Sequence, residues 1–552
     1  MKKKAWYRTV ELIILIFLFG LFSGCAPDRF SFFTSAPPPQ AVKPVSEEIQ
    51  INGSGEQQNW QKSTLAADEP LVLSLEEAIV LTLRNNRDLQ VQQLQPVITG
   101  AFEKIERGVF DPELFVEGAN LKEESFETSS TSGTSYRLDS KEYAVIGGLR
   151  QRFPSGTDIE ASIEQSREDS NREPEQQVAR LGLTLTQALL RGFGPAVNMV
   201  GVRQAELKTL ASENQLRGFT EALLAETEIA YWNYVLAEKE IAIFEESLAV
   251  ARKQHDEIAS RIEVGILPEI EIAAARAEIG RREQALIEAR SVFSERRLRL
   301  LRLLNTGPFG RLERPVVATS QADIEAKPLN DLDDRIRLAC QFRPDLQEAD
   351  LLLQQNRLET IVTRNGLLPR LDFFIALGKT GYADSFSDSF RQLDGNTYDF
   401  TVGVRLSHFL GNRSAQGQDL AARASTRQAA EALANLRQVV ELDVRLGAND
   451  VERNRRQIAA SRLTRIYEEE TLNAEQERFD VGSSTALQVA QAQRDLLASR
   501  IAEVQAVINY RIALVKLYLA EGSLLQRRGI KIAPFTAQKT GFFPAGNPGG
   551  HQ

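Results

Sequence analysis

The sequence predicts an α+β membrane protein with two internal structural repeats, in which β-strands of the barrel type are joined to long coiled-coil helices. Three observations lead to this fold class: a helical hairpin that occurs twice, stretches in which apolar and polar residues alternate, and two helix-forming stretches that are too long for a globule. The repeat carries the most weight, because it sets the order of elements in both halves of the chain.

The duplicated hairpin is clearest at its turn. Residues 261–289 align with residues 478–506 at a constant offset of 217. In each copy a helical pattern stops at a glycine, Gly265 or Gly482, and then resumes. Glycine is favoured just after a helix because it enters the left-handed conformation without a steric cost. Candidate caps for the second returning helix are Ser483, Ser484 and Thr485.

Two helix-forming stretches exceed the size of a globular domain. They run from about residue 197 to 263 and from about residue 414 to 481, and neither contains proline. At about 1.5 Å per residue, a helix of roughly 65 residues is about 100 Å long. Helices of this length bury their apolar stripes by packing side by side, so the sequence predicts coiled coils.

Residues of alternating polarity precede each long helix. The second half contains two such stretches, 373–377 and 400–406. The first half contains four predicted strands, at about 110–121, 143–153, 158–164 and 180–186. One apolar and one polar face are what a membrane barrel requires, because closure of the sheet satisfies every backbone group in lipid. A soluble two-sheet domain would show the same alternation, and the long helices favour the barrel.

The repeat also sets the predicted domain boundaries. Both halves follow the order short helix, helix, strands, long helix, turn and returning helix, and the first half has 40 extra residues before its long helix. We expect a first repeat at 71–305, a linker at 306–330 and a second repeat at 331–525. The flanking segments 25–70 and 526–552 are rich in proline, glycine and polar residues, which predicts a disordered tether and a disordered tail.

The first 24 residues are typical of a signal peptide. Lys2, Lys3 and Lys4 precede an apolar run, Leu12–Phe22, that is too short to span a bilayer comfortably. The run ends in Ser23-Gly24-Cys25, which resembles the bacterial lipoprotein box, where the cysteine is acylated and becomes the mature N-terminus. Phe22 departs from the leucine usual at that place, so an ordinary signal peptide with an incidental cysteine is the alternative.

Composition excludes several classes of function. A net charge of −9 argues against a nucleic-acid partner. Two cysteines and three histidines, scattered along the chain, do not make a disulfide framework, a metal cluster or a catalytic triad. No glycine-rich phosphate loop follows a strand. We therefore predict no catalytic residues, no metal site and no cofactor, and we expect Cys340 to be a buried small residue and Tyr231, Trp232 and Tyr234 to pack between helices.

From about Leu73 to Leu525 the sequence resembles the TolC-like outer membrane efflux proteins. The resemblance rests on the duplicated unit and on four motifs in a fixed order: LTQALLRGFG at 185–194, RIEVG at 261–265, LLPRLD at 367–372 and RFDVG at 478–482. It implies a homotrimer with a β-barrel in the outer membrane, continued by a long α-helical periplasmic tunnel. It also implies two protein partners, a periplasmic adaptor and an inner-membrane pump, besides outer-membrane lipid.

By this resemblance the protein is expected to be a passive export duct of a tripartite efflux or type I secretion system, and not an enzyme. It would lie in the outer membrane, lipid-anchored at Cys25, with a large periplasmic portion. The alternative is a periplasmic coiled-coil scaffold or adaptor without a barrel. Drug, metal and protein cargo are all compatible with the sequence.

The resemblance assigns roles to residues of the hairpins. The turns at Gly265 and Gly482 would be the membrane-distal tips where the adaptor docks. Arg261 and Arg478, four residues earlier, are placed to satisfy the last helix carbonyls. Family protomers usually contribute four strands, two per half, and the six strands predicted here depart from that number.

A second departure concerns the tunnel entrance. Better-known members carry an aspartate pair near the tip that narrows the entrance and binds cations, whereas the matching positions here are Gln488 and Gln491. Glutamine supplies no fixed negative charge. The predicted entrance residues lie three or four apart on the returning helices: Glu271, Glu278, Gln488, Gln491 and Asp495. For Glu271 and Asp495 the alternative is an ordinary solvated helix face.

Overall fold

The structure, a computed structural model, describes residues 70–128, 133–172, 174–305, 311–322 and 325–531. The predicted signal peptide, the lipidation residue Cys25, nearly all of the tether and most of the tail lie outside the described residues. Both predicted repeats lie within them, apart from short gaps.

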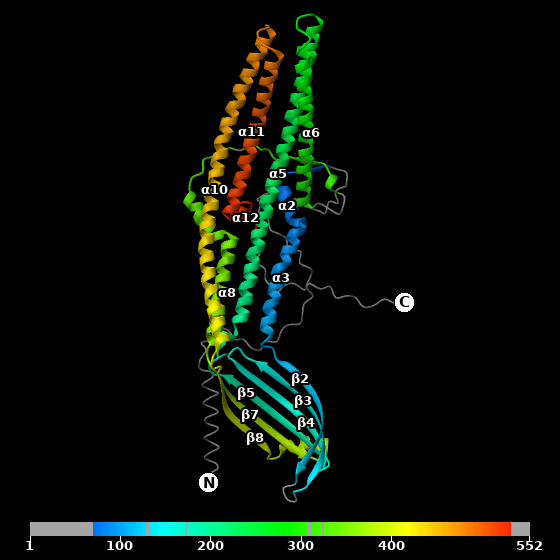
Figure 1. The fold of residues 1–552 in the computed structure, drawn as a ribbon, viewed down its shortest axis with the longest axis vertical. Coiled ribbons are helices and arrows are strands. Elements are labelled where there is room, and N and C mark those ends of the chain that lie inside the picture. Colours follow the sequence, from blue (N-terminus) through cyan, green and yellow to red (C-terminus); the bar gives the residue numbers. More distant parts are fainter. Residues whose placement is uncertain (1–69, 129–132, 173, 306–310, 323–324, 532–552) are drawn as a thin grey trace, which may run out of the picture. The chain divides into compact units, whose positions relative to one another are not determined.

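Each repeat contains a pair of short helices and a long helical hairpin (Figure 1). The first repeat contains α2 Leu75–Asn85, α3 Arg87–Gly108, α4 Pro195–Asn198, α5 Val200–Glu263 and α6 Glu271–Leu304. The second contains α7 Leu332–Phe342, α8 Pro344–Gly366, α9 Phe386–Arg391, α10 Arg413–Asp480, α11 Ala486–Ala520 and α12 Leu524–Arg527. The two long helices have 64 and 68 residues, as predicted. Among the described residues, no helix combines the length and the apolar content needed to cross a membrane.

The first helix begins at a capping box that the sequence contains in full. Ser74 accepts a hydrogen bond from the backbone N–H of Glu77, and the Glu77 carboxylate accepts one from the backbone N–H of Ser74 at 2.7 Å. These two bonds satisfy N–H groups that have no partner inside the helix. Pro96 lies inside α3, which continues past it as one helix.

The six predicted strands form one antiparallel sheet in the order β2-β3-β4-β5-β7-β8 (Figure 1). Their bounds are β2 Glu113–Thr128, β3 Ser135–Arg152, β4 Thr157–Ser170, β5 Gln176–Ala188, β7 Arg370–Ala383 and β8 Tyr398–Ser407. A separate parallel pair joins β1 Leu71–Leu73 to β6 Val316–Ala318. The extra strands of the first repeat therefore belong to the same sheet as the rest. Several strands run further than predicted, because their outer ends, such as Lys122–Thr128, are mostly polar.

The strand register gives the sheet two unlike faces. One row of neighbouring residues across all six strands is apolar: Leu114, Leu149, Ala161, Leu183, Leu377 and Phe400. The row beside it, on the opposite face, is mainly polar: Glu113, Arg150, Glu160, Thr184, Ala376 and Thr401. Many apolar side chains of the first face are exposed, among them Val402 and Val404 of β8. An exposed apolar surface of this extent requires a covering partner or lipid.

The main core forms where the short elements pack against the middle of α5. Tyr231, Trp232 and Tyr234 are buried there, as expected, and the Tyr231 hydroxyl donates to the Leu73 carbonyl at 3.0 Å. The guanidinium of Arg511 lies 4.4 Å from the Trp232 ring centroid. This packing joins β1 and the long hairpins in one core.

Cys340 is exposed, contrary to the prediction that it is buried. Its neighbour Ala339 is the fully buried residue of α7. Successive helix residues point about 100° apart, so the residue next to a core position faces away from the core.

Candidate functional site

The tips of the two hairpins end in the same backbone motif. Gly265 has φ of 76° and Gly482 has φ of 78°, the left-handed conformation predicted for both. The backbone N–H of Ile266 donates to the Arg261 carbonyl, and that of Ser483 donates to the Arg478 carbonyl, both at 2.8 Å. These are the long hydrogen bonds of a Schellman motif, so both helices end in the same way.

The arginines four residues before the glycines do not cap carbonyls with their side chains. Arg261 Nη2 instead lies 2.6 Å from Asp480 Oδ1, and its guanidinium is 5.4 Å from the Phe479 ring centroid. Arg478 pairs with Glu475 of its own helix at 2.6 Å. The carbonyls were already satisfied by the backbone, which left the side chains free to form ion pairs. The pair between Arg261 and Asp480 joins the two hairpins.

The hairpin tips share a small apolar core. It contains the buried residues Ile258, Ala275, Phe479, Ala486 and Val489, drawn from α5, α6, α10 and α11. The carboxylate of Glu271 accepts a hydrogen bond from the backbone N–H of Ala486 at 3.3 Å, at the start of α11. The first and second repeats are thus held together at the tip by packing, by this hydrogen bond and by the ion pair between Arg261 and Asp480.

The predicted entrance residues divide into two groups. Gln491 and Asp495 are exposed on one stripe of α11, as is Gln488, which also completes a capping box with Thr485 at the helix start. Glu271 is half-buried. Glu278, by contrast, is only 3% exposed and does not lie on an open stripe. The structure therefore brings together the three residues of α11 and separates Glu278 from them.

Glu278 lies in a cluster of arginines between α6 and α11. Its Oε2 accepts from Arg281 Nη2 at 2.8 Å and from Arg494 Nη1 at 3.3 Å. Its Oε1 lies 2.7 Å from Arg282 Nη2, although these two atoms are not aligned as a hydrogen bond. Arg282 is 4% exposed, and burial lowers its pKa, an effect that Glu278 opposes. In this conformation Glu278 is a buried counter-ion and not a free carboxylate.

Sequence reasoning missed this cluster, although its spacing was visible. Arg281 and Arg282 follow Glu278 by three and four residues, the separations that place side chains on one helix face. Arg494 comes from the other repeat, 216 residues away, and no local pattern predicts that contact.

Further buried carboxylates lie where the hairpins meet the short helices. Glu228 and Glu521 are fully buried, and their partners are Arg528 for Glu228 and Arg335 and Arg527 for Glu521. Buried acids of this kind are paired with bases because an unpaired buried charge is costly. Glu221 of α5 is also buried, but its nearest arginine contact, with Arg217, is longer, at 3.5 Å. Burial raises the pKa of Glu221 to about 7.

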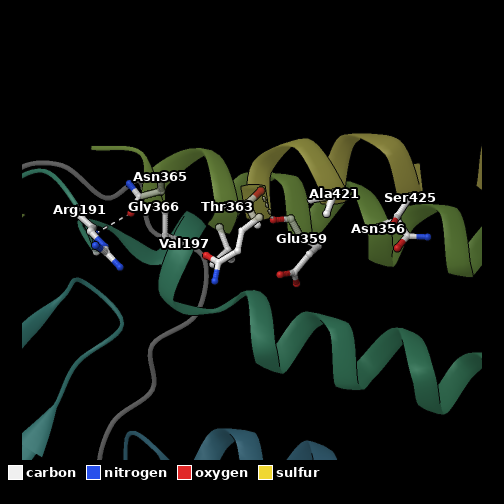
Figure 2. A pocket seen from close by; sticks show the side chains of 13 residues that line it. Arg191, Val197, Asn356, Glu359, Thr363, Asn365, Gly366, Ala421 and Ser425 are labelled. Atoms are coloured by element: carbon white, nitrogen blue, oxygen red, sulfur yellow. Dashed lines mark hydrogen bonds between the residues drawn. The ribbon is translucent and has the colours of Figure 1, made fainter. Parts of the chain in front are cut away.

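A pocket lies where the sheet joins the helices (Figure 2). It is lined by α8, by α10 and by the segment between β5 and α5. Asn365 Oδ1 accepts a hydrogen bond from the backbone N–H of Gly192 at 2.8 Å, which ties that segment to α8. The lining residues include one acid, Glu359, one base, Arg191, and no histidine or cysteine.

Gly482→Ala is expected to weaken the second hairpin tip by about 1–2 kcal/mol, because alanine is strained in the left-handed conformation. No atom lies within 4 Å of a Cβ added at Gly482, so the effect isolates backbone strain from steric clash. Gly280→Ala is the matched control: Gly280 is equally uncrowded but lies inside α6, where alanine stabilises by about 0.5–1 kcal/mol. Hydrogen exchange of the backbone amides near the tip measures the effect of each substitution on local stability. If both substitutions stabilise or both destabilise, the left-handed assignment of Gly482 is contradicted.

Comparison with known proteins relates the second repeat to a known family. Residues 336–523, which make up most of the second repeat, match the family model described as outer membrane efflux protein. A curated relative, the outer membrane efflux protein BepC of Brucella suis, is 24% identical over 367 residues, which cover 65% of this chain and 75% of BepC.

Solved structures share the fold. The CmeC outer membrane channel of Campylobacter jejuni is 15% identical with a TM-score of 0.60, and the match covers 90% of this chain and 98% of CmeC. The MtrE outer membrane channel of Neisseria gonorrhoeae, crystallised in an open state, is 18% identical with a TM-score of 0.58. The match covers 88% of this chain and 98% of MtrE. The second repeat therefore matches the outer membrane efflux protein family, and the chain shares its fold across both repeats with solved outer membrane channels.

Proposed function

We propose that the protein is the outer-membrane channel of a tripartite efflux or type I secretion system. It would be a passive duct, without catalysis of its own, for substrates delivered by an inner-membrane pump and a periplasmic adaptor. The proposal rests mainly on one observation: the same chain contains a sheet with an exposed apolar face and two long helical hairpins. In a trimer, the sheets would close a barrel and the hairpins would line a tunnel.

The two faces of the sheet support this arrangement. The apolar face, with Val402, Val404 and Leu406 exposed, suits contact with lipid, and the polar face, with Glu113 and Arg150 paired at 2.8 Å, suits a wet lumen. A periplasmic scaffold or adaptor would gain nothing from such an apolar surface, which would promote aggregation in water. We therefore favour the channel over the scaffold.

The hairpin tips would form the periplasmic end of the duct. In this proposal the adaptor docks at the turns of Gly265 and Gly482, with Arg261 and Arg478 beside them. Both turns are exposed apart from their shared apolar core, so they are accessible to a partner. The exposed stripe of Gln488, Gln491 and Asp495 would face the axis at the entrance.

A reconstitution experiment tests the channel. Purified protein added to a planar lipid bilayer should give discrete single-channel currents, because only a closed pore conducts through the membrane. A scaffold would give none. Migration of the unheated protein as a trimer, lost on boiling, is the accompanying measurement, and absence of both would contradict the proposal.

Cation block of these currents is expected to be weak. Glutamine at positions 488 and 491 provides no ring of fixed negative charge, so the block that remains should come from Glu271. Glu271→Gln should remove the block by a trivalent cation added at the periplasmic side, and Glu283→Gln, an exposed acid of α6 that is not among the predicted entrance residues, is the control. Strong block that survives Glu271→Gln would show that other residues form the entrance charge.

Cys25 is expected to be acylated, because it ends an apolar run at a Ser-Gly-Cys site. Cys25→Ser should abolish labelling of the protein by radioactive palmitate in cells. The control is Cys340→Ser, which removes the exposed cysteine of α7 and should leave labelling unchanged. Labelling that persists in Cys25→Ser would contradict the assignment of Cys25, and absence of labelling in the native protein would indicate an ordinary signal peptide.

A further inference from the structure

We propose that β3 and β4 form an inserted hairpin that widens the barrel, so that three copies close an eighteen-stranded barrel in which β8 of one copy pairs with β2 of the next. The inference rests on the proposed function, from which it takes the trimer and the barrel. It goes beyond that function because the family pattern of four strands per protomer gives twelve strands.

The two repeats show which strands are inserted. Pro112 precedes β2 and Pro369 precedes β7, and these two prolines correspond in the repeat alignment. β5 and β8 are each the last strand before a long helix, α5 or α10. β3 and β4 thus have no counterpart in the second repeat. They lie between β2 and β5 in the sheet, with pairing along 16, 13 and 12 residues at the three contacts, so they are part of the wall.

Both edges of the sheet are suited to a second copy. Within the described residues, β2 pairs only with β3, and β8 pairs only with β7. Neighbouring strands are antiparallel throughout, so in a sheet of six strands the first and last run in opposite directions. β8 of one copy therefore meets β2 of the next in antiparallel orientation, and the alternation continues around a closed ring.

The stagger of the strands has the value that a barrel requires. The row of paired residues that starts at Glu113, the first residue of β2, ends at Thr401, six residues before the end of β8 at Ser407. Six residues rise about 20 Å, and six strands span about 29 Å. These lengths correspond to a strand tilt of about 35°, at the low end of the range for closed barrels.

The same geometry predicts the register between copies. Glu113 and Ser407 both lie at the helical end of the sheet, and placing them side by side sets Val404 opposite Val116 and Leu406 opposite Leu114. All four side chains are on the apolar face and are between 62% and 77% exposed. A slip of one residue would turn one edge strand's apolar side chains into the lumen. Because apolar side chains meet apolar side chains in this register, we infer that it is the register between copies. The partner that pairs with each free edge of the sheet is therefore a second copy of the chain.

Widening follows from the strand number. Barrel diameter grows roughly linearly with the number of strands, so eighteen strands give a diameter about 1.5 times that of twelve. Barrels of 16–18 strands hold an open aqueous channel. The outer-membrane exit of this duct would then admit bulkier cargo than a twelve-stranded one, and selection by size would fall to the tunnel entrance.

Disulfide trapping tests the closing pair. In a Cys340→Ser background, Val404→Cys combined with Val116→Cys should give covalent trimers on a non-reducing gel after oxidation in the membrane. The matched control combines Val404→Cys with Ile163→Cys of β4, which lies in the same row as Val116 and is 50% exposed. Each single-cysteine variant shows how much crosslinking occurs without the designed pair. Trapping through Ile163 and not through Val116 would overturn the proposal in favour of twelve strands, with β2 and β3 outside the wall.

A size measurement provides the second test. Polyethylene glycols of increasing mass, added at the extracellular side of a planar bilayer, should enter the native barrel at larger sizes than they enter a variant that lacks residues 135–170, the inserted hairpin. Equal size limits for two conducting proteins would overturn the proposal. If the deletion variant does not assemble, disulfide trapping decides. Failure of the proposed function is a different result, in which the native protein forms neither trimers nor conducting pores.

Discussion

Glu278→Ala is expected to destabilise the hairpin tips by about 3–5 kcal/mol, the cost of removing one partner from a buried ion pair. The substitution leaves Arg282, which is 4% exposed, without the carboxylate that lies 2.7 Å from its Nη2. Arg494 of the second repeat would lose its contact with the first repeat as well. Hydrogen exchange along α6 and α11 should therefore quicken near the tip, and single-channel conductance should rise if the tip is the closed entrance.

Two further variants separate this mechanism from a general effect of removing charge. Glu283 is on the same helix and pairs with Arg252 at 2.7 Å, but both side chains are exposed. Glu283→Ala should cost no more than about 1 kcal/mol. Glu278→Leu combined with Arg282→Leu removes both buried charges and should recover much of the stability. If the double variant is no more stable than Glu278→Ala, the uncompensated arginine is not the cause.

Glu221→Gln is expected to stabilise the protein at pH 8 by up to about 3 kcal/mol. Burial raises the pKa of Glu221 from the ordinary 4.5 to about 7, and the partial charge compensation comes from Arg217 and Arg343. The folded state therefore binds more protons than the unfolded chain between these two pH values. The contribution of Glu221 to the free energy of unfolding is therefore greatest below about pH 4.5. It falls as pH rises through about 7, because a charged carboxylate must then be held in the core.

The thermal midpoint for loss of helicity, measured at pH 5 and pH 8, tests this sign. The native protein should lose more stability between the two values than Glu221→Gln. Glu226→Gln is the control, since Glu226 lies on the same helix but is exposed. A native protein whose midpoint rises between pH 5 and pH 8 relative to both variants would contradict the assignment.

The sequence was informative wherever local patterns determine structure. The left-handed glycines 265 and 482 and the six strands of the large sheet depend on neighbours in the chain, and both were predicted. The pairing of Glu278 with Arg494 and of Arg261 with Asp480 depends on contacts between the repeats, which no local pattern encodes. Strand ends were missed for a related reason: in the outer half of β2, backbone pairing and ion pairs such as Arg137 with Glu124 replace the apolar alternation.

The pairing of β5 with β7 has a consequence for how the protein matures. It joins Gln177 to Ala383 and Ala188 to Asp372, residues about two hundred positions apart in the chain. The four strands of the first repeat are complete early in synthesis, yet one of their edges has no partner until the second repeat follows. Long-range pairing of this kind is slow to form, and an unpaired strand edge readily joins other chains. Productive folding therefore depends on keeping the first repeat from associating until the second repeat is available to pair with it, a task suited to a holding chaperone.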